Sequence, residues 1–370
     1  MANWFQRLVM PGLVFESVVI GGGYATGREL VEFFLRHGPL AGLLGLVATL
    51  IVWGIVLAIT FEFARLTRSF DYRTFFVHLI GRAWVLYDIL YYATLILVLS
   101  VIGAACSTLF HQSFGMPGWL GAALLMLCAA FLVYFGNTLV ERVLSAWGIA
   151  LYVLYGGIVL WCLTHYSAVI GQNLRIPPTD ASWIAGGVAY AGYNLAAAPA
   201  VLFCLRHASR RRDAVIAGLA GGAFAVLPGI LLYVSVIAFY PAITREPVPA
   251  VAIVSNIGSR TFSFIFELAL FITLIKTGVG LLHALNERIA AAFSIRRAHM
   301  PRGLRPLVTL GILTFALFLA DRVGIIALVA RGYGTITYGF LAIYVLPIMT
   351  VGLWRVCRGA AAAAPAEEGA

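Results

Sequence analysis

The stretch GGGYATGRE, residues Gly21–Glu29, interrupts the first strongly apolar segment of the chain. Three consecutive glycines are followed within six residues by a threonine, an arginine and a glutamate. Glycine in a helix interior carries a large entropic cost, so three in a row disfavour a continuous helix. In a bilayer, irregular backbone persists only where it is buried in protein or lines a cavity. If this segment crosses a membrane, the stretch predicts a helix that is broken beside a cavity.

Composition predicts that the segment does cross a membrane. Of the 370 residues, 62% are hydrophobic and 11% are charged, with a mean hydropathy of +0.97. Soluble domains are roughly 45–50% apolar and about 25% charged. The net charge of +10 would suggest a nucleic-acid partner in a soluble protein, but in a membrane protein the location of the charges matters more. We therefore expect a polytopic membrane protein with membrane lipid as a partner and no nucleic acid. The five cysteines have no ligand spacing, so no metal site is expected.

Windows of about 20 apolar residues, long enough to cross a bilayer, indicate ten transmembrane helices. They lie near residues 8–36, 39–64, 83–110, 117–135, 143–169, 182–205, 214–239, 261–285, 304–320 and 324–354. With the N-terminus inside, the inner segments carry 17 arginines and the outer segments carry 7. By the positive-inside rule, both termini should be cytoplasmic, in the inner membrane of a bacterium.

The residues after the glycines have the pattern of a helix start. Thr26 and Glu29 have the T-x-x-E spacing of a capping box, in which Thr26 is the N-cap and Glu29 reaches back to its amide. On this interpretation the first span consists of two half-helices, near 8–21 and 27–36. The alternative is close helix packing, because Gly23 and Gly27 also fit a small-xxx-small face. A nucleotide-binding loop is disfavoured because no G-x-G-x-x-G spacing is present.

The sixth span, SWIAGGVAYAGYNLAAAPAV, carries a second candidate break. The residues that weaken it or bring polar groups to its middle are Gly186, Gly187, Tyr190, Gly192, Tyr193, Asn194 and Pro199. Asn194 is placed to cap a second half-helix whose first turn ends near Pro199. The alternative is an ordinary glycine–proline kink.

The positions of the two breaks are informative together. They fall in spans one and six of ten, which is the same place in each half of the chain. Since five is an odd number, the halves should be inverted repeats, at residues 1–169 and 182–354, followed by a disordered tail at 355–370. Matching interrupted helices in inverted halves indicate a secondary transporter with its site near the membrane midplane.

Three stretches resemble known families: GGGYATGRELVEFF (Gly21–Phe34), YAGYNLAAAPAVLF (Tyr190–Phe203) and ARGYGTITYGFLAIYVLP (Ala330–Pro347). The chain resembles the YkvI-like membrane proteins, and its architecture resembles the leucine-transporter (amino acid–polyamine–organocation) fold. The resemblance implies a five-plus-five inverted repeat and ion-coupled transport, without a substrate. It also implies that span eight packs on the break in span one and offers hydroxyls, here Thr273 and Thr277, to a sodium ion.

Lys276 is the only lysine of the chain and lies in the middle of span eight. A central lysine costs roughly 2.5–3.5 kcal/mol on insertion scales, so it is expected to pair or to function. One hypothesis is that its ammonium occupies the cation site and that it releases a proton during transport. Sodium coupling is the second hypothesis, and structural pairing with Glu16, Asp88 or Glu267 is the third.

Asp88, in span three, is expected either to pair with a buried cation or to lie at the interface. Tyr91 and Tyr92 follow it near mid-span. One of these rings is expected to line the site; the alternative is that both only pack against neighbouring helices.

These patterns predict a secondary active transporter, a cation-coupled symporter of a small organic solute that is amino-acid-like or related. It would work by alternating access with a coupling proton, or sodium as the alternative, and no other cofactor. A non-transporting sensor, scaffold or channel is the main alternative. An integral membrane enzyme is disfavoured because no catalytic constellation is present. The residues expected to contact the solute are Gly21, Gly22, Gly23, Tyr24, Ala25, Thr26, Gly27, Tyr91, Tyr92, Tyr190, Tyr193 and Asn194; those expected to couple the ion are Asp88, Thr273, Lys276 and Thr277.

Overall fold

The computed structural model describes residues 3–135, 138–178, 180–295, 301 and 304–359, and every regular element in these ranges is a helix. The first expected span is divided into α1 (Met10–Val19), α2 (Gly22–Ala25) and α3 (Arg28–Phe33). The main elements that follow are α4 (Pro39–Thr67), α5 (Tyr72–Ile80), α6 (Trp84–Phe114), α7 (Gly118–Phe135), α8 (Thr138–Asn173), α9 (Ser182–Asn194), η4 (Leu195–His207), α10 (Arg211–Ile237), η5 (Ala242–Arg245), α11 (Pro249–Ser255), α12 (Arg260–Ile295) and α13 (Leu304–Val323). A last helical stretch, interrupted by π-helical turns, runs from α14 (Ile325–Ala327) to α16 (Leu353–Arg358).

The all-helical membrane fold is confirmed. Eight helical segments in the described residues are long and apolar enough to cross a membrane, and α7 is a shorter apolar helix. The count of ten spans and the division into two repeats stay predictions. Residues 355–358, which were placed in the expected tail, are helical, because α16 extends to Arg358. Residues 360–370 lie outside the described part of the chain.

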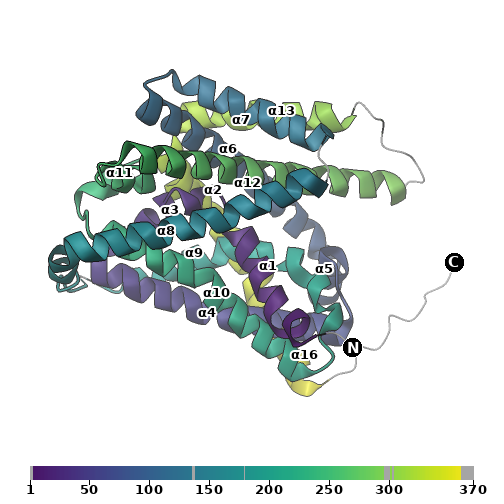
Figure 1. The fold of residues 1–370 in the computed structure, drawn as a ribbon. Coiled ribbons are helices and arrows are strands. Elements are labelled where there is room, and N and C mark those ends of the chain that lie inside the picture. The colour runs from purple at the N-terminus through teal and green to yellow at the C-terminus, as the bar shows by residue number, and fades with distance from the viewer. Residues whose placement is uncertain (1–2, 136–137, 179, 296–300, 302–303, 360–370) are drawn as a thin grey trace.

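The helices form two packed groups (Figure 1). In the first group α10 packs along α4, which also contacts α9, while α1 lies against α10. In the second group α6 packs against α7, α12 and α13. Helix α8 contacts both α10 and α12, and so lies between the groups. The broken first span also joins them, since α1 contacts α10 whereas α2 contacts α6 and α12.

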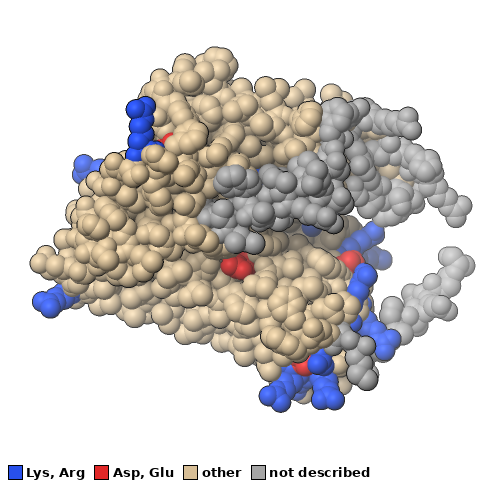
Figure 2. All heavy atoms as spheres, in the orientation of Figure 1, with Lys and Arg blue, Asp and Glu red and all other residues tan. Residues whose placement is uncertain are grey.

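The surface is that of a protein in lipid. Large apolar side chains are exposed on the outer helices, including Leu127 at 69%, Leu160 at 66% and Leu307 at 66%. Such exposure would be unfavourable in water, but it costs nothing against lipid tails. Figure 2 shows Lys and Arg side chains gathered mainly at the end of the molecule where α16 lies beside the start of α1. The cytoplasmic location of that end stays a prediction.

The first group is held together by backbone contact between glycines and a neighbouring helix. A Cβ atom added at Gly218 of α10 would lie 2.4 Å from the backbone nitrogen of Ala58 in α4. At Gly222, one turn further along α10, it would lie 2.8 Å from the backbone nitrogen of Gly54. Small residues that allow helices this close are the usual basis of packing within membranes.

Gly218→Leu should therefore separate α4 from α10 and destabilise the protein. Overpacking of this kind costs about 1–3 kcal/mol, which we expect to lower the apparent Tm of the purified protein by about 5 °C in a thermal unfolding assay. The matched control is Gly157→Leu in α8, where an added Cβ atom meets nothing within 4 Å. Equal loss of stability in the two variants would show that this contact does not hold the first group together.

Candidate functional site

The break in span one is present, and it consists of two interruptions. α1 ends at Val19. Its C-cap Ile20 has a ψ of 74°, and Gly21 is extended, with φ −95° and ψ −169°. After the single turn of α2, Gly27 adopts φ 76°, a left-handed conformation that a side chain would strain. The predicted break is thus confirmed, with a short helical turn between its two parts.

The predicted capping box is wrong. Gly27, not Thr26, is the N-cap of α3, so the helix begins one residue later than the T-x-x-E spacing requires. The Thr26 hydroxyl donates to the Gly23 carbonyl oxygen at 2.7 Å and accepts from the Arg28 amide at 3.3 Å. The carboxylate of Glu29 points elsewhere and accepts a hydrogen bond from the Tyr193 hydroxyl.

The polar backbone of the break is largely paired within the protein. The amides of Ala25, Thr26 and Gly27 donate to the carbonyl oxygens of Gly21, Gly22 and Tyr24 at 3.0, 3.1 and 2.9 Å. Ala25, Thr26 and Gly27 were all expected to contact the solute, but their amides are not free in this structure. Among the carbonyls, that of Ala25 accepts from the Tyr155 hydroxyl and that of Thr26 accepts from the Ala250 amide.

Span six changes helix type instead of opening into an extended break. The α-helix α9 ends at Asn194, and the chain continues directly as the 3₁₀-helix η4, which contains Pro199. Asn194 remains helical and caps nothing, because its side-chain amide donates to the Tyr190 carbonyl oxygen at 3.0 Å. Long 3₁₀ segments are uncommon, and within a helix they often mark a hinge.

The glycines at the start of α9 serve close packing, not a break. A Cβ atom at Gly186 would lie 2.3 Å from the carbonyl oxygen of Phe33 in α3, and one at Gly187 would lie 2.5 Å from that of Gly45 in α4. These contacts bring α9 close to α3 and α4. The two interrupted spans thus face each other.

Two adjoining cavities lie at the break. The inner cavity, of about 110 Å³, lies between the two interrupted spans and α6 and reaches α12 at Thr277. Seven predicted site residues line it: Gly21, Gly22, Gly23, Tyr91, Tyr193, Asn194 and Thr277. The wide cavity, of about 440 Å³, is lined by Tyr91, Thr273, Lys276 and Thr277 among others. Tyr91 and Thr277 belong to both linings, so the two cavities are neighbours.

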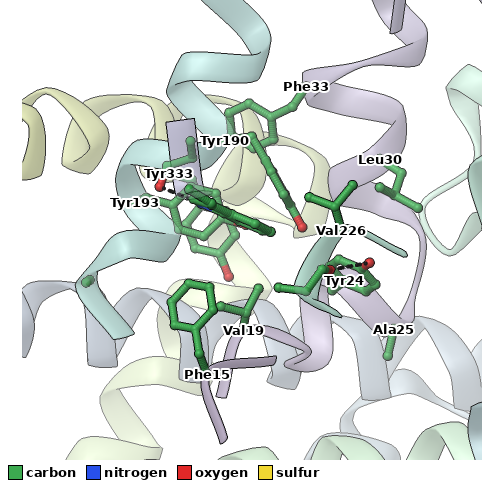
Figure 3. Close-up of a cluster of buried hydrophobic side chains, with 14 of the residues drawn as sticks. Phe15, Val19, Tyr24, Ala25, Leu30, Phe33, Tyr190, Tyr193, Val226 and Tyr333 are labelled. Carbon is green, nitrogen blue, oxygen red and sulfur yellow. Dashed lines mark hydrogen bonds between the residues drawn. The ribbon is translucent and has the colours of Figure 1, made fainter. Parts of the chain in front are cut away.

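The other predicted site residues lie outside both linings: Tyr24, Ala25, Thr26, Gly27, Asp88, Tyr92 and Tyr190. Figure 3 shows Tyr190 beside Phe33, Tyr193 and Tyr333, in an aromatic cluster between α9 and neighbouring segments. The ring of Tyr193 stacks on that of Tyr333 with centroids 4.5 Å apart. Tyr24 is buried and donates from its hydroxyl to the Ala225 carbonyl oxygen at 3.2 Å.

Lys276 lines the wide cavity opposite the first span. Within the described part of the chain no carboxylate lies within the 4.0 Å of an ion pair with its ammonium, although Glu16 lines the same cavity. The neighbouring hydroxyls of Thr273 and Thr277 donate to carbonyl oxygens of their own helix. The methyl group of Thr277 lies beside the break, 3.3 Å from where a Cβ atom at Gly21 would be.

Asp88 pairs with a buried cation, which is Arg288 and not Lys276. The distance from Arg288 Nη1 to Asp88 Oδ1 is 2.6 Å, and both side chains are less than 20% exposed. The guanidinium also lies 3.8 Å from the ring centroid of Tyr72 and 3.7 Å from that of Tyr91. The guanidinium of this pair therefore packs against Tyr91, which lines both cavities.

The structure adds Glu29, which the sequence predicts only as part of a helix cap. Glu29 is 4% exposed and lines the inner cavity, where it is the only acidic side chain among the described residues. The signal in the sequence was a carboxylate two residues beyond the last glycine of the break. A helix-start pattern explained this carboxylate well enough to hide its place in the cavity lining.

On the side away from the termini, the break is sealed by Arg28. Its guanidinium donates to the carbonyl oxygens of Thr244 and Glu246 at 2.9 and 3.1 Å, and pairs with Glu32 at 2.8 Å. Thr244 lies in η5, in the connection that also contains α11, so these contacts fix α3 to the segment after span seven. Arg28 is 3% exposed, and this outer latch, formed by Arg28 with Thr244, Glu246 and Glu32, is closed.

Comparison with known sequences gives two bacterial relatives, neither of them characterised. The chain is 22% identical over 294 residues to the uncharacterized membrane protein YkvI of Bacillus subtilis, covering 78% of this chain and 82% of that protein. It is 24% identical over 344 residues to the uncharacterized protein YyaD of the same organism, covering 90% and 93%. No family model matches the chain.

Solved structures show the fold. MhsT in complex with L-phenylalanine superposes with a TM-score of 0.56 at 16% identity, covering 97% of this chain and 98% of that chain. A mutant of the manganese transporter of Eremococcus coleocola superposes with a TM-score of 0.58 at 15% identity, covering 96% and 83%. These matches are not to enzymes. The chain therefore has the leucine-transporter fold and is similar to YkvI, as its three sequence stretches predicted.

Proposed function

We propose that the protein is a secondary active transporter of a small organic solute, amino-acid-like or related, driven by a proton gradient. The observation that carries this proposal is the pair of adjoining cavities at the junction of two interrupted helices. Similar structures include a protein bound to L-phenylalanine and a manganese transporter. A solute site between discontinuous helices is the general design of such transporters.

The solute would occupy the inner cavity, in contact with Tyr193, Asn194 and the backbone at Gly21–Gly23. The wide cavity would be its route to the side where the termini lie. A sensor or a channel would not need a site that is sealed on one side and entered from the other.

Lys276 would couple transport to the proton. Its ammonium lines the wide cavity without a carboxylate in ion-pair distance among the described residues, so its charge is not already committed to a structural pair. An amine in a desolvated position gives up its proton readily, unlike a guanidinium. Sodium, bound near Thr273 and Thr277, is the alternative coupling ion.

Alternating access would follow from motion of the first helix group against the second. The outer latch must release for the inner cavity to open on its side, and the Asp88–Arg288 pair lies at the opposite end of the route. The change of helix type between α9 and η4 provides a place for α9 to bend.

The coupling proposal predicts that Lys276→Met abolishes uptake driven by a proton gradient in proteoliposomes, with a loss of at least about tenfold. Solutes found to stabilise the purified protein would be tested under separate proton and sodium gradients. Lys276→Arg keeps the positive charge but holds its proton, and should also lose proton-driven uptake. Full proton-driven uptake by either variant would overturn the role of Lys276. If no solute moves under any gradient while the protein is folded, the transporter function itself is wrong.

The outer latch predicts a second result. Arg28→Ala removes three charge-assisted hydrogen bonds, each worth roughly 1.5–3 kcal/mol, so the inner cavity should open more often on the η5 side. We would replace the five native cysteines, introduce Ala197→Cys in the lining of the inner cavity, and label it from that side with a membrane-impermeant maleimide. Labelling should become about tenfold faster.

Arg36→Ala is the control for this experiment. Arg36 also pairs with Glu32, but its side chain is 57% exposed and its hydrogen bond to Glu32 does not reach η5. The substitution should therefore change the labelling rate little. Equal acceleration by the two variants, or none by Arg28→Ala, would contradict a latch at Arg28.

A further inference from the structure

Glu29 lies at the inner cavity without a counter-charge among the described residues. Its carboxylate is buried in the first turn of α3, and it is the only acidic group in that lining. No lysine or arginine of the described chain lines the inner cavity either. In the same residues, no basic side chain comes within 4.0 Å of its oxygens.

The nearby basic side chains are either paired with other groups or lie outside the inner cavity. Arg28, the residue before Glu29, binds the Thr244 and Glu246 carbonyls and Glu32. Lys276 lines the wide cavity and not the inner one. The charge of an ionised Glu29 is therefore balanced by none of the basic side chains whose positions the structure gives.

The surroundings of Glu29 hold the carboxylate in place and leave room beside it. The Tyr193 hydroxyl donates to Oε2, and the ring of Tyr193 is itself stacked on Tyr333. Oε1 lies over Gly23, where an added Cβ atom would collide with it. The glycine break thus makes the space into which the carboxylate projects.

An ionised carboxylate buried without a partner costs several kcal/mol, whereas a pair with good geometry recovers that cost. The missing cation must then come from solution, either as a proton or as part of a ligand. The inner cavity adjoins the carboxylate, and its volume of about 110 Å³ limits the ligand to a small solute.

The lining favours an organic cation over a metal ion. Within the described residues, no group of three or more His, Cys, Asp or Glu side chains could hold a metal. Beside the single carboxylate the cavity offers tyrosine rings, which attract ammonium groups, and aliphatic side chains such as Leu95 and Val98. We propose that Glu29 binds the primary ammonium group of the transported solute, whose small apolar body lies against these aliphatic side chains.

This inference rests on the proposed function, because it names the chemistry of the solute at the same site. It separates amines and amino acids, which carry the ammonium group, from carboxylic acids and neutral solutes, which do not. The binding energy would come from a charge-assisted hydrogen bond formed in a site that excludes water.

The test uses four probes that share an isobutyl group: isoamylamine, leucine, isovalerate and isoamyl alcohol. Thermal unfolding of the purified full chain would be followed at increasing probe concentration. Isoamylamine and leucine should raise the Tm, while isovalerate and isoamyl alcohol should not. In Glu29→Gln, which keeps the shape of the side chain, half-maximal stabilisation should need at least about tenfold more amine.

Glu267→Gln is the matched control, since Glu267 lines neither cavity, and it should leave the response to amine unchanged. Tyr193→Phe is a second variant that keeps the carboxylate and removes the hydroxyl that holds it. It should weaken the response to amine less than Glu29→Gln does. If Glu29→Gln does not fold, Tyr193→Phe and the four-probe pattern of the unmodified protein decide the question.

Stabilisation by isovalerate, or a response to amine that survives Glu29→Gln, would overturn the inference. So would Glu29-dependent stabilisation by sodium chloride over potassium chloride without any response to amines, because Glu29 would then belong to a sodium site. Uptake assays separate this from the proposed function. If gradient-driven uptake of an anion survives Glu29→Gln, the transporter function stands and the ammonium site is wrong. If amines bind but no solute is transported, the ammonium site stands and the transporter function is wrong.

Discussion

The structure depends on the requirement that backbone polar groups inside a membrane be hydrogen-bonded. A continuous helix meets this requirement alone, but the broken first span cannot. It needs a hydroxyl from α8, an amide from the connection at α11, and the single turn of α2 to pair its own groups. Breaking one helix therefore draws distant segments around the break, and the cavities lie among them.

Small residues then decide how close those segments come. At Gly22 an added Cβ atom would lie 2.7 Å from both Ile102 of α6 and Leu274 of α12, so the second helix group approaches the backbone of the break itself. At Gly23 the space is taken by the carboxylate of Glu29. Two adjacent glycines thus have different uses: Gly22 allows packing, and Gly23 admits a functional group. The alternatives of packing and break, which the sequence left open, are both realised.

Sequence reasoning predicted the fold and the break in span one better than the contacts around that break. Glycine runs and hydropathy are local properties, so the first break could be read from them. Contacts between distant residues could not: Asp88 had more than one candidate role until Arg288, 200 positions away, was found beside it. In span six, packing against α3 and α4 kept the chain helical through Gly186 and Gly187, where glycine content alone predicted weakness.

The capping-box error shows why Glu29 was hidden. A carboxylate near a helix start is stabilised by the free amides there, so the pattern has a sufficient local explanation. The structure removes that explanation, because Gly27 is the N-cap of α3 and the side chain turns toward Tyr193. What remains is a buried carboxylate whose stabilisation is incomplete without a cation. A solute with an ammonium group would complete this interaction when it binds. The free energy gained would favour the bound state, and it would be lost again on release.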